Sequence, residues 1–233
     1  MKTPSFSEIR KYLPHAKNEL INIKIFRFFT PVFLKLLILM KITPNTVSFS
    51  WLILGFLGAV LVFTGDYMYA LAGIILIQIS QFIDQMDGPL SRYYRKAHPI
   101  GQYLDKVGVT IHRTLLLTGI SFGAYSFYGN KIYLYSAMII PIFSLSGIFF
   151  KSLQDVLAYQ NNIKKPTIVK RRLYQNNIKD YIVEFFRPTN PLNITLFAAI
   201  FGYLYFLALP YLGFMFLYSV YQFIRSYKTI KKF

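Results

Sequence analysis

The sequence contains no cysteine and very little acid. Without a thiol it can form neither a disulfide nor a metal site built on thiolates. Only 9 of its 233 residues are Asp or Glu, against 26 Lys and Arg, and the formal net charge is +17. No stretch has the pattern of a soluble nucleic-acid-binding module, and the basic residues flank apolar runs instead. We therefore expect anionic lipid head groups as the partner of these cations, and no nucleic acid.

Charged residues of either sign are scarce, whereas apolar residues are abundant and come in long blocks. Charged side chains make up 15% of the chain and apolar ones 55%, and the mean hydropathy is +0.41. In a soluble domain about a quarter of the residues are charged. The composition therefore argues against an ordinary soluble protein and indicates an integral membrane protein.

Six stretches are apolar over roughly the 20 residues that a helix needs to cross the hydrocarbon layer. They are residues 47–64, 68–87, 99–126, 132–150, 191–208 and 211–226. Pro210 separates the last two, so we expect a tight helical hairpin there. Residues 26–40 are apolar as well, but cations interrupt them, which favours an amphipathic helix in the membrane interface over a seventh span. The predicted fold is all-α: a polytopic membrane protein of six transmembrane helices with an N-terminal interfacial helix.

The distribution of Lys and Arg predicts the orientation of these helices. Eight lie in residues 1–45, three in 88–98, eight in the polar connection 151–190 and four from Arg225 onward, whereas the opposite turns contain only Lys131. Because cytoplasmic loops carry the excess of cations, both termini and the 88–98 loop are predicted to be cytoplasmic. We divide the chain into an N-terminal cytoplasmic or interfacial segment, a six-helix membrane domain and a basic C-terminal tail; their bounds are 1–45, 46–226 and 227–233.

Three of the nine acids lie where the second predicted span ends and the third begins. Asp84 and Asp87 are three residues apart, which places both on one face of a helix, and Asp105 enters from the same side. Two antiparallel neighbouring helices would bring the three carboxylates together. Because carboxylates without countercharge repel each other, the pattern favours a shared divalent cation, Mg²⁺ or Mn²⁺. The alternative is that each Asp caps a helix or pairs with a nearby Arg or Lys.

Two glycines and an arginine surround these acids. Gly88 follows an acid directly and allows a phosphate to approach the backbone, and Arg92 supplies a forked donor for phosphate oxygens. Gly101 precedes Asp105 by four residues. Together these residues indicate a diphosphate site at the membrane surface, on its cytoplasmic side, for an amphiphile with a nucleotide or other diphosphate head.

The spacing of these residues resembles the signature of the CDP-alcohol phosphatidyltransferase family, D-x2-D-G-x2-A-R-x8-G-x3-D-x3-D. The sequence reads Asp84-x2-Asp87-Gly88-x2-Ser91-Arg92-x8-Gly101-x3-Asp105. The stretch ITPNTVS at 42–48 also resembles the Thr-Pro-Asn start of the first span in that family. The resemblance implies transfer of a phosphoalcohol group from a CDP-alcohol to an acceptor hydroxyl with release of CMP, in phospholipid biosynthesis.

The resemblance also implies roles for individual residues. Metal ligands are Asp84, Asp87 and Asp105, which bind a pair of Mg²⁺ or Mn²⁺ ions. Candidate substrate-binding residues are Asn45, Gly88, Ser91, Arg92 and Gly101. The expected partners are a CDP-activated lipid or alcohol, an acceptor alcohol and membrane lipids. A homodimer is left open, because Gly55 and Gly58 on the first span allow close contact between helices.

The fourth acid of the family signature is absent, because position 109 is a valine. In the family that Asp is a metal ligand and the proposed base, and Val109 can do neither. One interpretation makes His112 the catalytic base, since it lies seven residues after Asp105 on nearly the same face. The other is a catalytically silent relative that still binds metal or nucleotide. For His112 itself, the alternative role is a hydrogen bond between helices, for example to Gln78.

Arg113 places a cation near the middle of the third predicted span, where a charge is costly. No acid occurs at that depth in any predicted span. We include Arg113 among the candidate substrate-binding residues, as a contact for an anionic acceptor or a lipid phosphate. The alternative is that its guanidinium bonds to backbone carbonyls or extends to the membrane surface.

Overall fold

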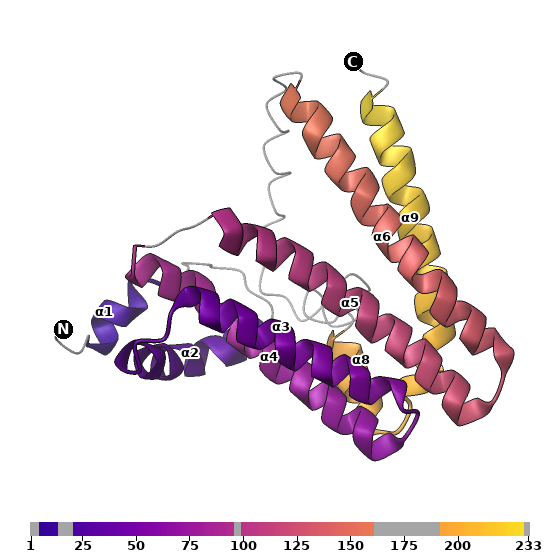
Figure 1. Ribbon diagram of the computed structural model, residues 1–233, viewed down its shortest axis with the longest axis horizontal. Coiled ribbons are helices and arrows are strands. Elements are labelled where there is room, and N and C mark those ends of the chain that lie inside the picture. The colour runs from indigo at the N-terminus through magenta and orange to yellow at the C-terminus, as the bar shows by residue number, and fades with distance from the viewer. Residues whose placement is uncertain (1–4, 14–20, 96–98, 161–191, 231–233) are drawn as a thin grey trace.

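The computed structural model describes residues 5–13, 21–95, 99–160 and 192–230, without the side chains at 21–27, 99–106, 151, 154, 155, 157–160, 192, 229 and 230. In these ranges every regular element is a helix. In chain order they are α1 (Phe6–Arg10), α2 (Ile21–Leu39), α3 (Pro44–Phe63), α4 (Tyr67–Tyr93), α5 (Pro99–Tyr128), α6 (Lys131–Gln160), α8 (Leu192–Ile200), the 3-10 helix η1 (Leu204–Leu207) and α9 (Ala208–Ile230) (Figure 1). The predicted all-α fold class is confirmed.

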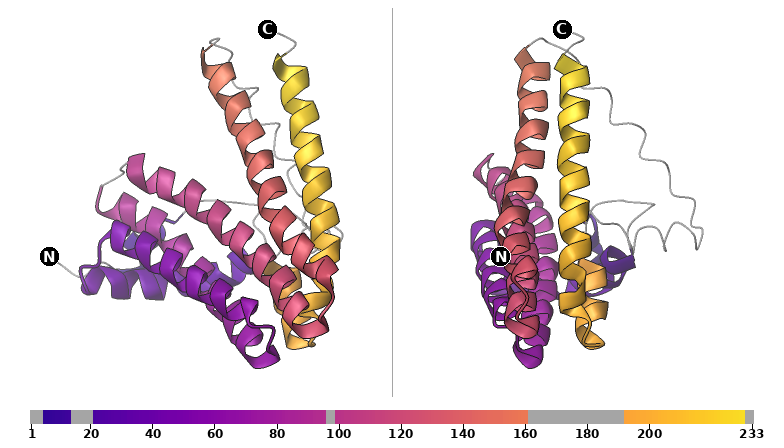
Figure 2. Two further views of the ribbon diagram at one scale, coloured as in Figure 1. Left: turned by 45° about the vertical axis from the view of Figure 1, so that its right-hand side comes forward. Right: turned by 90° about the vertical axis from the view of Figure 1, so that its right-hand side faces the viewer.

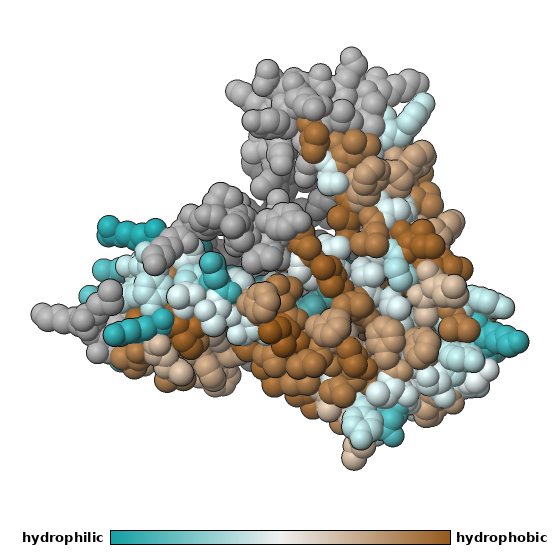
Figure 3. All heavy atoms as spheres, viewed as in Figure 1, coloured by the Kyte–Doolittle hydropathy of each residue, from teal (hydrophilic) through white to brown (hydrophobic). Residues whose placement is uncertain are grey.

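Five helical stretches are long and apolar enough to cross a membrane. They are Pro44–Phe63, Tyr67–Tyr93, Val107–Tyr128, Lys131–Phe150 and Leu204–Lys228. Large apolar side chains such as Phe49, Phe56 and Met138 are exposed on them, as expected for helices surrounded by lipid. Figure 3 shows hydrophobic side chains over the middle of the molecule and hydrophilic ones gathered toward its ends. The predicted membrane-helix architecture is confirmed, and the count of six spans stays a prediction.

The last two predicted spans are separated at Gly202 and not at Pro210. Gly202 follows α8 with a φ of +77°, a left-handed conformation that favours glycine. Pro210 lies in the first turn of α9, where its missing N–H removes no helical hydrogen bond. The predicted break at Pro210 was wrong because proline is compatible with the start of a helix. Of the fifth predicted span, residue 191 lies outside the described residues.

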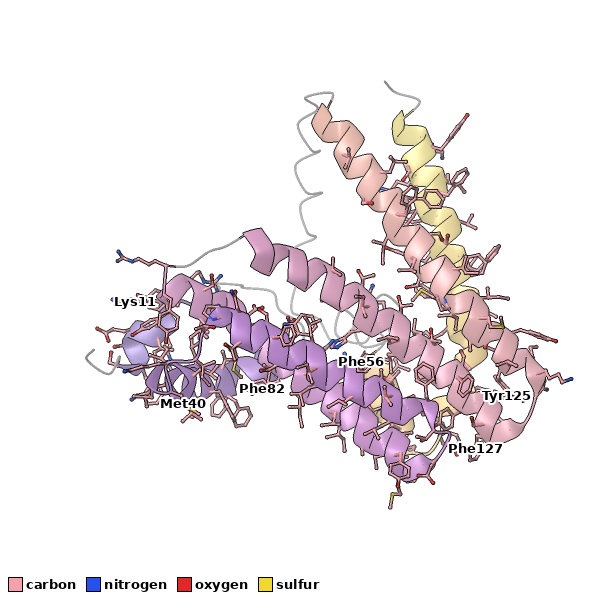
Figure 4. All side chains as sticks on the ribbon, viewed as in Figure 1. Lys11, Met40, Phe56, Phe82, Tyr125 and Phe127 are labelled. Atoms are coloured by element: carbon pink, nitrogen blue, oxygen red, sulfur yellow. The ribbon has the colours of Figure 1, made fainter. Side chains whose placement is uncertain are left out.

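The helices form two arms that meet at one end of the molecule. In the first arm α3 packs against both α4 and α5, and in the second α6 and α9 run side by side (Figures 1 and 2). We call the end where the arms meet the closed end, and it contains the turns at 64–66, 129–130 and 201–203. At the open end α3 and α5 begin and α4 ends. Figure 4 shows Lys11 at the open end and Phe127 at the closed end.

Small residues let α3 approach its neighbours within the chain. A Cβ at residue 58 would lie 2.6 Å from the carbonyl oxygen of Gly73 on α4. A Cβ at residue 55 would overlap the imidazole of His112 on α5. Gly55 and Gly58, the two glycines that sequence analysis associated with a homodimer, are therefore used for packing inside one chain.

The closed end is fixed by turn geometry and by hydrogen bonds to the backbone. Gly65 and Gly129 have φ angles of +80° and +70°, which only glycine adopts without strain. Asp66 caps α4 by accepting hydrogen bonds from two backbone N–H groups of its first turn. The buried hydroxyl of Tyr205 donates to the carbonyl of Val62 at 3.1 Å, next to a large cluster of buried apolar side chains. The hydrogen bond from Tyr205 therefore ties η1 to the end of α3.

α1 and α2 pack on the open end of the first arm. Ile9 of α1 and Leu34 and Ile38 of α2 are buried in one cluster with residues of α3 and α4. The opposite side of α2 exposes large apolar side chains: Phe28, Phe29, Val32, Phe33, Leu36 and Leu39. α2 includes residues 26–39 of the N-terminal helix predicted over 26–40, with one side against protein and the other exposed. Its position in the membrane interface stays a prediction.

Candidate functional site

The last turns of α4 carry the first half of the motif. α4 continues through Pro89, whereas the predicted second span ended at residue 87. Asp84, Asp87 and Ser91 lie on one helix at spacings of three and seven residues, which places them on one face. Their side chains are half-buried. The predicted convergence of Asp84 and Asp87 on a single face is therefore met by a continuous helix.

Ser48 of α3 contacts Asp87 directly. Its hydroxyl donates to Oδ2 of Asp87 at 2.9 Å and also lies 3.2 Å from the carbonyl oxygen of Pro44. Ser48 is only 3% exposed, so this hydrogen bond is shielded from water and fixes the carboxylate toward α3. Ser48 is not among the residues predicted for the site, although it ends the ITPNTVS stretch. Its position on the buried stripe of α3, one residue after buried Val47, is the signal that could have found it.

The register of α3 also sets the depth of α5. A Cβ at Gly108 would lie 2.5 Å from side-chain atoms of both Trp51 and Leu52. α3 and α5 both begin at the open end, so they run in the same direction. The backbone of Asp105 lies about one turn before Gly108, and we infer that it is at the depth of Ser48, which lies about one turn before Trp51 and Leu52. Since Ser48 contacts Asp87, the backbone positions of Asp87 and Asp105 lie at about the same depth along their helices. The side chain of Asp105 lies outside the described residues.

The predicted direct pairing of the second and third spans is not what the described residues show. α4 and α5 each pack on α3, and they make no comparably extensive contact with each other. A short connection between antiparallel helices favours adjacency, but the small residues Gly58, Gly73 and Gly108 create closer packing surfaces on both sides of α3. The acids of α4 and α5 are therefore related through a third helix.

Arg92 is exposed at the end of α4 and is held by the N-terminal segment. Its Nε donates to the carbonyl oxygen of Tyr12 at 2.8 Å. Its two terminal nitrogens lie 3.8 and 4.0 Å from the position that a Cβ would take at Gly88. The terminal part of the guanidinium is thus near the backbone of Gly88, where sequence analysis expects a phosphate to approach. Tyr12 was not predicted, because it contributes a backbone carbonyl, which every residue type has.

Two further candidate substrate-binding residues, Asn45 and Gly101, lie in the first turns of their helices. Asn45 is exposed in the first turn of α3, whose N-cap is Thr43: the hydroxyl of Thr43 accepts from the N–H of Thr46 at 3.3 Å. Gly101 lies in the first turn of α5, and what surrounds it lies outside the described residues. Both residues are at the open end, the same end of the molecule as Asp87.

His112 packs on α3 and bonds to its backbone. Nε2 lies 3.1 Å from the carbonyl oxygen of Leu52, and the ring meets Trp51 edge-on with centroids 5.0 Å apart. A carbonyl only accepts, so Nε2 carries the proton and the neutral ring keeps its lone pair on Nδ1. The hydrogen bond between helices that sequence analysis considered for His112 is present, with Leu52 in place of Gln78 as the partner.

Val109 and Arg113 continue the helical stripe that Asp105 begins. The three residues are four apart on α5, so they lie one above the other on one side of the helix. Val109 is 37% exposed and Arg113 is half-buried. Tyr218 of α9 interacts electrostatically with the guanidinium of Arg113. Because side chains tilt toward the N-terminus of their helix, Arg113 starts toward Val109 and the open end.

A model of one protein family matches most of the chain. The model of the family described as CDP-alcohol phosphatidyltransferase matches residues 41–223, which is 183 of the 233 residues. The chain belongs to the CDP-alcohol phosphatidyltransferase family. The match covers the motif residues of α4 and α5 and leaves α1 and α2 outside it. A search of curated proteins finds no match to the chain.

CDP-alcohol phosphatidyltransferases as a family use divalent metal ions, so the candidate ligands of this chain should suit such an ion. Asp84 and Asp87 offer carboxylate oxygens from one face of α4, which are ligands that Mg²⁺ and Mn²⁺ prefer. Within the described side chains, which exclude that of Asp105, no cluster of three possible metal ligands occurs. The chemistry of the two described acids fits a hard divalent cation.

Proposed function

We propose that this protein is an integral membrane transferase of phospholipid biosynthesis. It moves a phosphoalcohol group from a CDP-alcohol to an acceptor hydroxyl and releases CMP. The acceptor oxygen forms a bond to the phosphorus that bears the alcohol, the phosphoanhydride bond to CMP breaks, and the acceptor proton passes to a base. The observation that carries the proposal is the register through α3, which relates Asp87 to the helix position of Asp105 by way of Ser48.

The donor side of the site is assigned to residues of the open end. Asp84, Asp87 and Asp105 hold Mg²⁺ or Mn²⁺, which when bound neutralises the diphosphate and stabilises the departing CMP. Arg92 directs its terminal nitrogens to a phosphate oxygen over Gly88. Ser91, Gly101 and Asn45 line the same end and complete the substrate-binding set. The excess of Lys and Arg near this end supports a cytoplasmic site and cytoplasmic termini.

The acceptor side is assigned to α5. His112 takes the acceptor proton on Nδ1, because its Nε2 proton is held by Leu52. Arg113 binds an anionic group of the acceptor or a lipid phosphate, since it is a cation half-buried in a span, where an anionic partner offsets the cost of its charge. Replacing Arg113 with Met should raise the acceptor KM with little change in the donor KM. An unchanged acceptor KM combined with lower expression would assign Arg113 to folding.

A second candidate function is a silent relative that binds metal or nucleotide without turnover. Two observations favour it: the valine at position 109 and the packing of His112 between Trp51 and Gly55. In this alternative His112 only joins α5 to α3.

CMP release by the purified protein separates the two candidates. The protein is assayed with CDP-diacylglycerol and other CDP-alcohols, a panel of acceptors and Mn²⁺, beside His112→Ala and Val109→Asp. Turnover in the wild type that falls by at least roughly a hundredfold in His112→Ala supports the transferase with a histidine base. Turnover that appears only in Val109→Asp supports the silent relative. Wild-type turnover that survives His112→Ala would keep the transferase and remove the histidine base.

A further inference from the structure

We infer that the N-terminal segment, residues 5–13, is a functional part of the donor site, because it orients Arg92 for the phosphates. The inference rests on the proposed function and adds a part of the chain that the family match, which begins at residue 41, does not include. Tyr12 is the positioning residue: it acts through Arg92 by its backbone carbonyl.

The sequence gives this segment a defined structure of its own. Ser5 and Glu8 form a capping box: the hydroxyl of Ser5 accepts from the N–H of Glu8 at 3.3 Å, and Glu8 accepts from the N–H of Ser5 at 2.8 Å. This fixes the first turn of α1 and the direction in which Ile9 points. A five-residue helix is not stable alone, so its position depends on packing against the rest of the chain.

Two contacts dock the segment on the open end. Ile9 is fully buried in the cluster that includes Leu34 of α2 and Leu90 of α4. The ring of Phe6 lies under Nζ of Lys35 at 4.4 Å, a cation–π contact between α1 and α2. Burying the apolar side chain of Ile9 removes it from water and stabilises the docked position. The residues after α1 are therefore held at a set distance from the end of α4.

The docked segment presents a carbonyl group to Arg92. Just beyond α1, the carbonyl of Tyr12 accepts from Nε of Arg92 at 2.8 Å. The ring of Tyr12 meets that of Tyr93, the next residue of α4, edge-on with centroids 5.4 Å apart. Both partners of the hydrogen bond are therefore anchored by neighbouring contacts, although Arg92 itself is exposed to solvent.

The hydrogen bond leaves the phosphate-binding part of the guanidinium available. Nε is used by Tyr12, whereas Nη1 and Nη2 lie 3.8 and 4.0 Å from the Cβ position of Gly88 and keep four N–H donors between them. A free arginine side chain must lose rotamer entropy when it binds a phosphate, and the contact with Tyr12 removes part of that cost beforehand. The expected benefit is tighter binding of the CDP-alcohol, without any direct contact between Tyr12 and the donor.

A double-mutant cycle on the full-length protein tests the inference. The affinity for CDP in the presence of Mn²⁺ is measured by calorimetry for the wild type, Ile9→Asp, Arg92→Ala and the double variant. Ile9→Asp detaches α1 and should weaken CDP binding about fivefold, whereas in the Arg92→Ala background it should change the affinity less than twofold. Ser7→Asp is the matched control, because it adds the same charge on the exposed side of α1, and its carboxylate can accept from the hydroxyl of Ser5, the present partner of Ser7. It should bind CDP like the wild type.

Each other outcome of the cycle overturns the inference. Equal weakening in both backgrounds would mean that the segment only stabilises the fold, and tighter binding by Ile9→Asp would mean that Tyr12 competes with the phosphate. A wild type that binds no CDP would remove the proposed function as well. If Ile9→Asp is not monodisperse, Arg92→Lys, which keeps the charge but lacks Nε, is combined with Ile9→Ala. Ile9→Ala should then weaken CDP binding in the wild type and have no effect beside Arg92→Lys.

Discussion

The two ends of the first arm are built from different interactions. At the closed end, buried apolar side chains, left-handed glycines and hydrogen bonds to backbone groups hold the helices together, as the contact of Tyr205 with Val62 shows. At the open end the contacts involve ionisable side chains: Ser48 donates to Asp87, and Arg92 donates to Tyr12. The buried apolar cluster at the open end is the smaller of the two, so we expect the closed end to contribute most of the stability, and we propose that the open end carries the chemistry.

Solvation explains why these roles are separated along the membrane normal. A carboxylate near the aqueous surface keeps part of its hydration, whereas the same group at mid-span would be costly. The acids on α4, Asp84 and Asp87, lie close to the end of the helix, and the middle of α4 is apolar. Substitutions at the two ends should therefore affect activity and stability independently.

The largest expected effect on activity is that of Asp87→Asn. The amide is nearly isosteric and can still accept from Ser48, but it lacks the charge that a divalent cation requires. CMP release should fall by at least roughly a hundredfold, while the thermal unfolding midpoint should change little. If Asp87→Asn retains activity at saturating Mn²⁺, or unfolds many degrees earlier, the assignment of this end to chemistry is wrong.

The reverse effect is expected for Gly58→Ala, which introduces a methyl group between α3 and α4. The new Cβ would lie 2.6 Å from the carbonyl of Gly73, so the helices must separate, and the free energy of unfolding should decrease by about 1–3 kcal/mol. Gly213→Ala is the matched control, because its Cβ has no heavy atom within 4 Å. Equilibrium unfolding in detergent measures the free energy of unfolding of both variants. Equal stability of the two variants would show that this contact does not hold the arm together.

Ser48→Ala tests whether packing and chemistry are separate at the open end, because Ser48 belongs to the packing of α3 and also to the site. Loss of its hydrogen bond should free the carboxylate of Asp87 and raise the Mn²⁺ concentration for half-maximal CMP release by about tenfold. Ser50→Ala removes a hydroxyl that bonds only within α3, to the carbonyl of Thr46, and should leave the Mn²⁺ dependence unchanged. A similar response of both variants would indicate a general effect of hydroxyl loss on the helix.

Hydropathy predicted where the helices lie, and motif spacing predicted that Asp84 and Asp87 share one face of a helix. Both features can be read from residues that are close together in the sequence. They did not predict that α3 lies between α4 and α5, since periodicity identifies the buried face of a helix and not the helix that covers it. The partner of His112 was unpredictable for the same reason: a backbone carbonyl such as that of Leu52 is present in every residue type. The turn at Gly202 could have been predicted from the glycine itself, but Pro210 was the more conspicuous helix-breaking residue.

The position of α3 between the two acid-bearing helices has a consequence for how the protein responds to its bilayer. Since Ser48 sets the depth of Asp87, and Trp51 and Leu52 set the depth of α5, a change of tilt in a thinner or thicker lipid layer moves the three helices as one body. The spacing between the acids is then preserved. The arm of α6 and α9 diverges toward the open end, so its angle to the first arm is the degree of freedom that can absorb the mismatch.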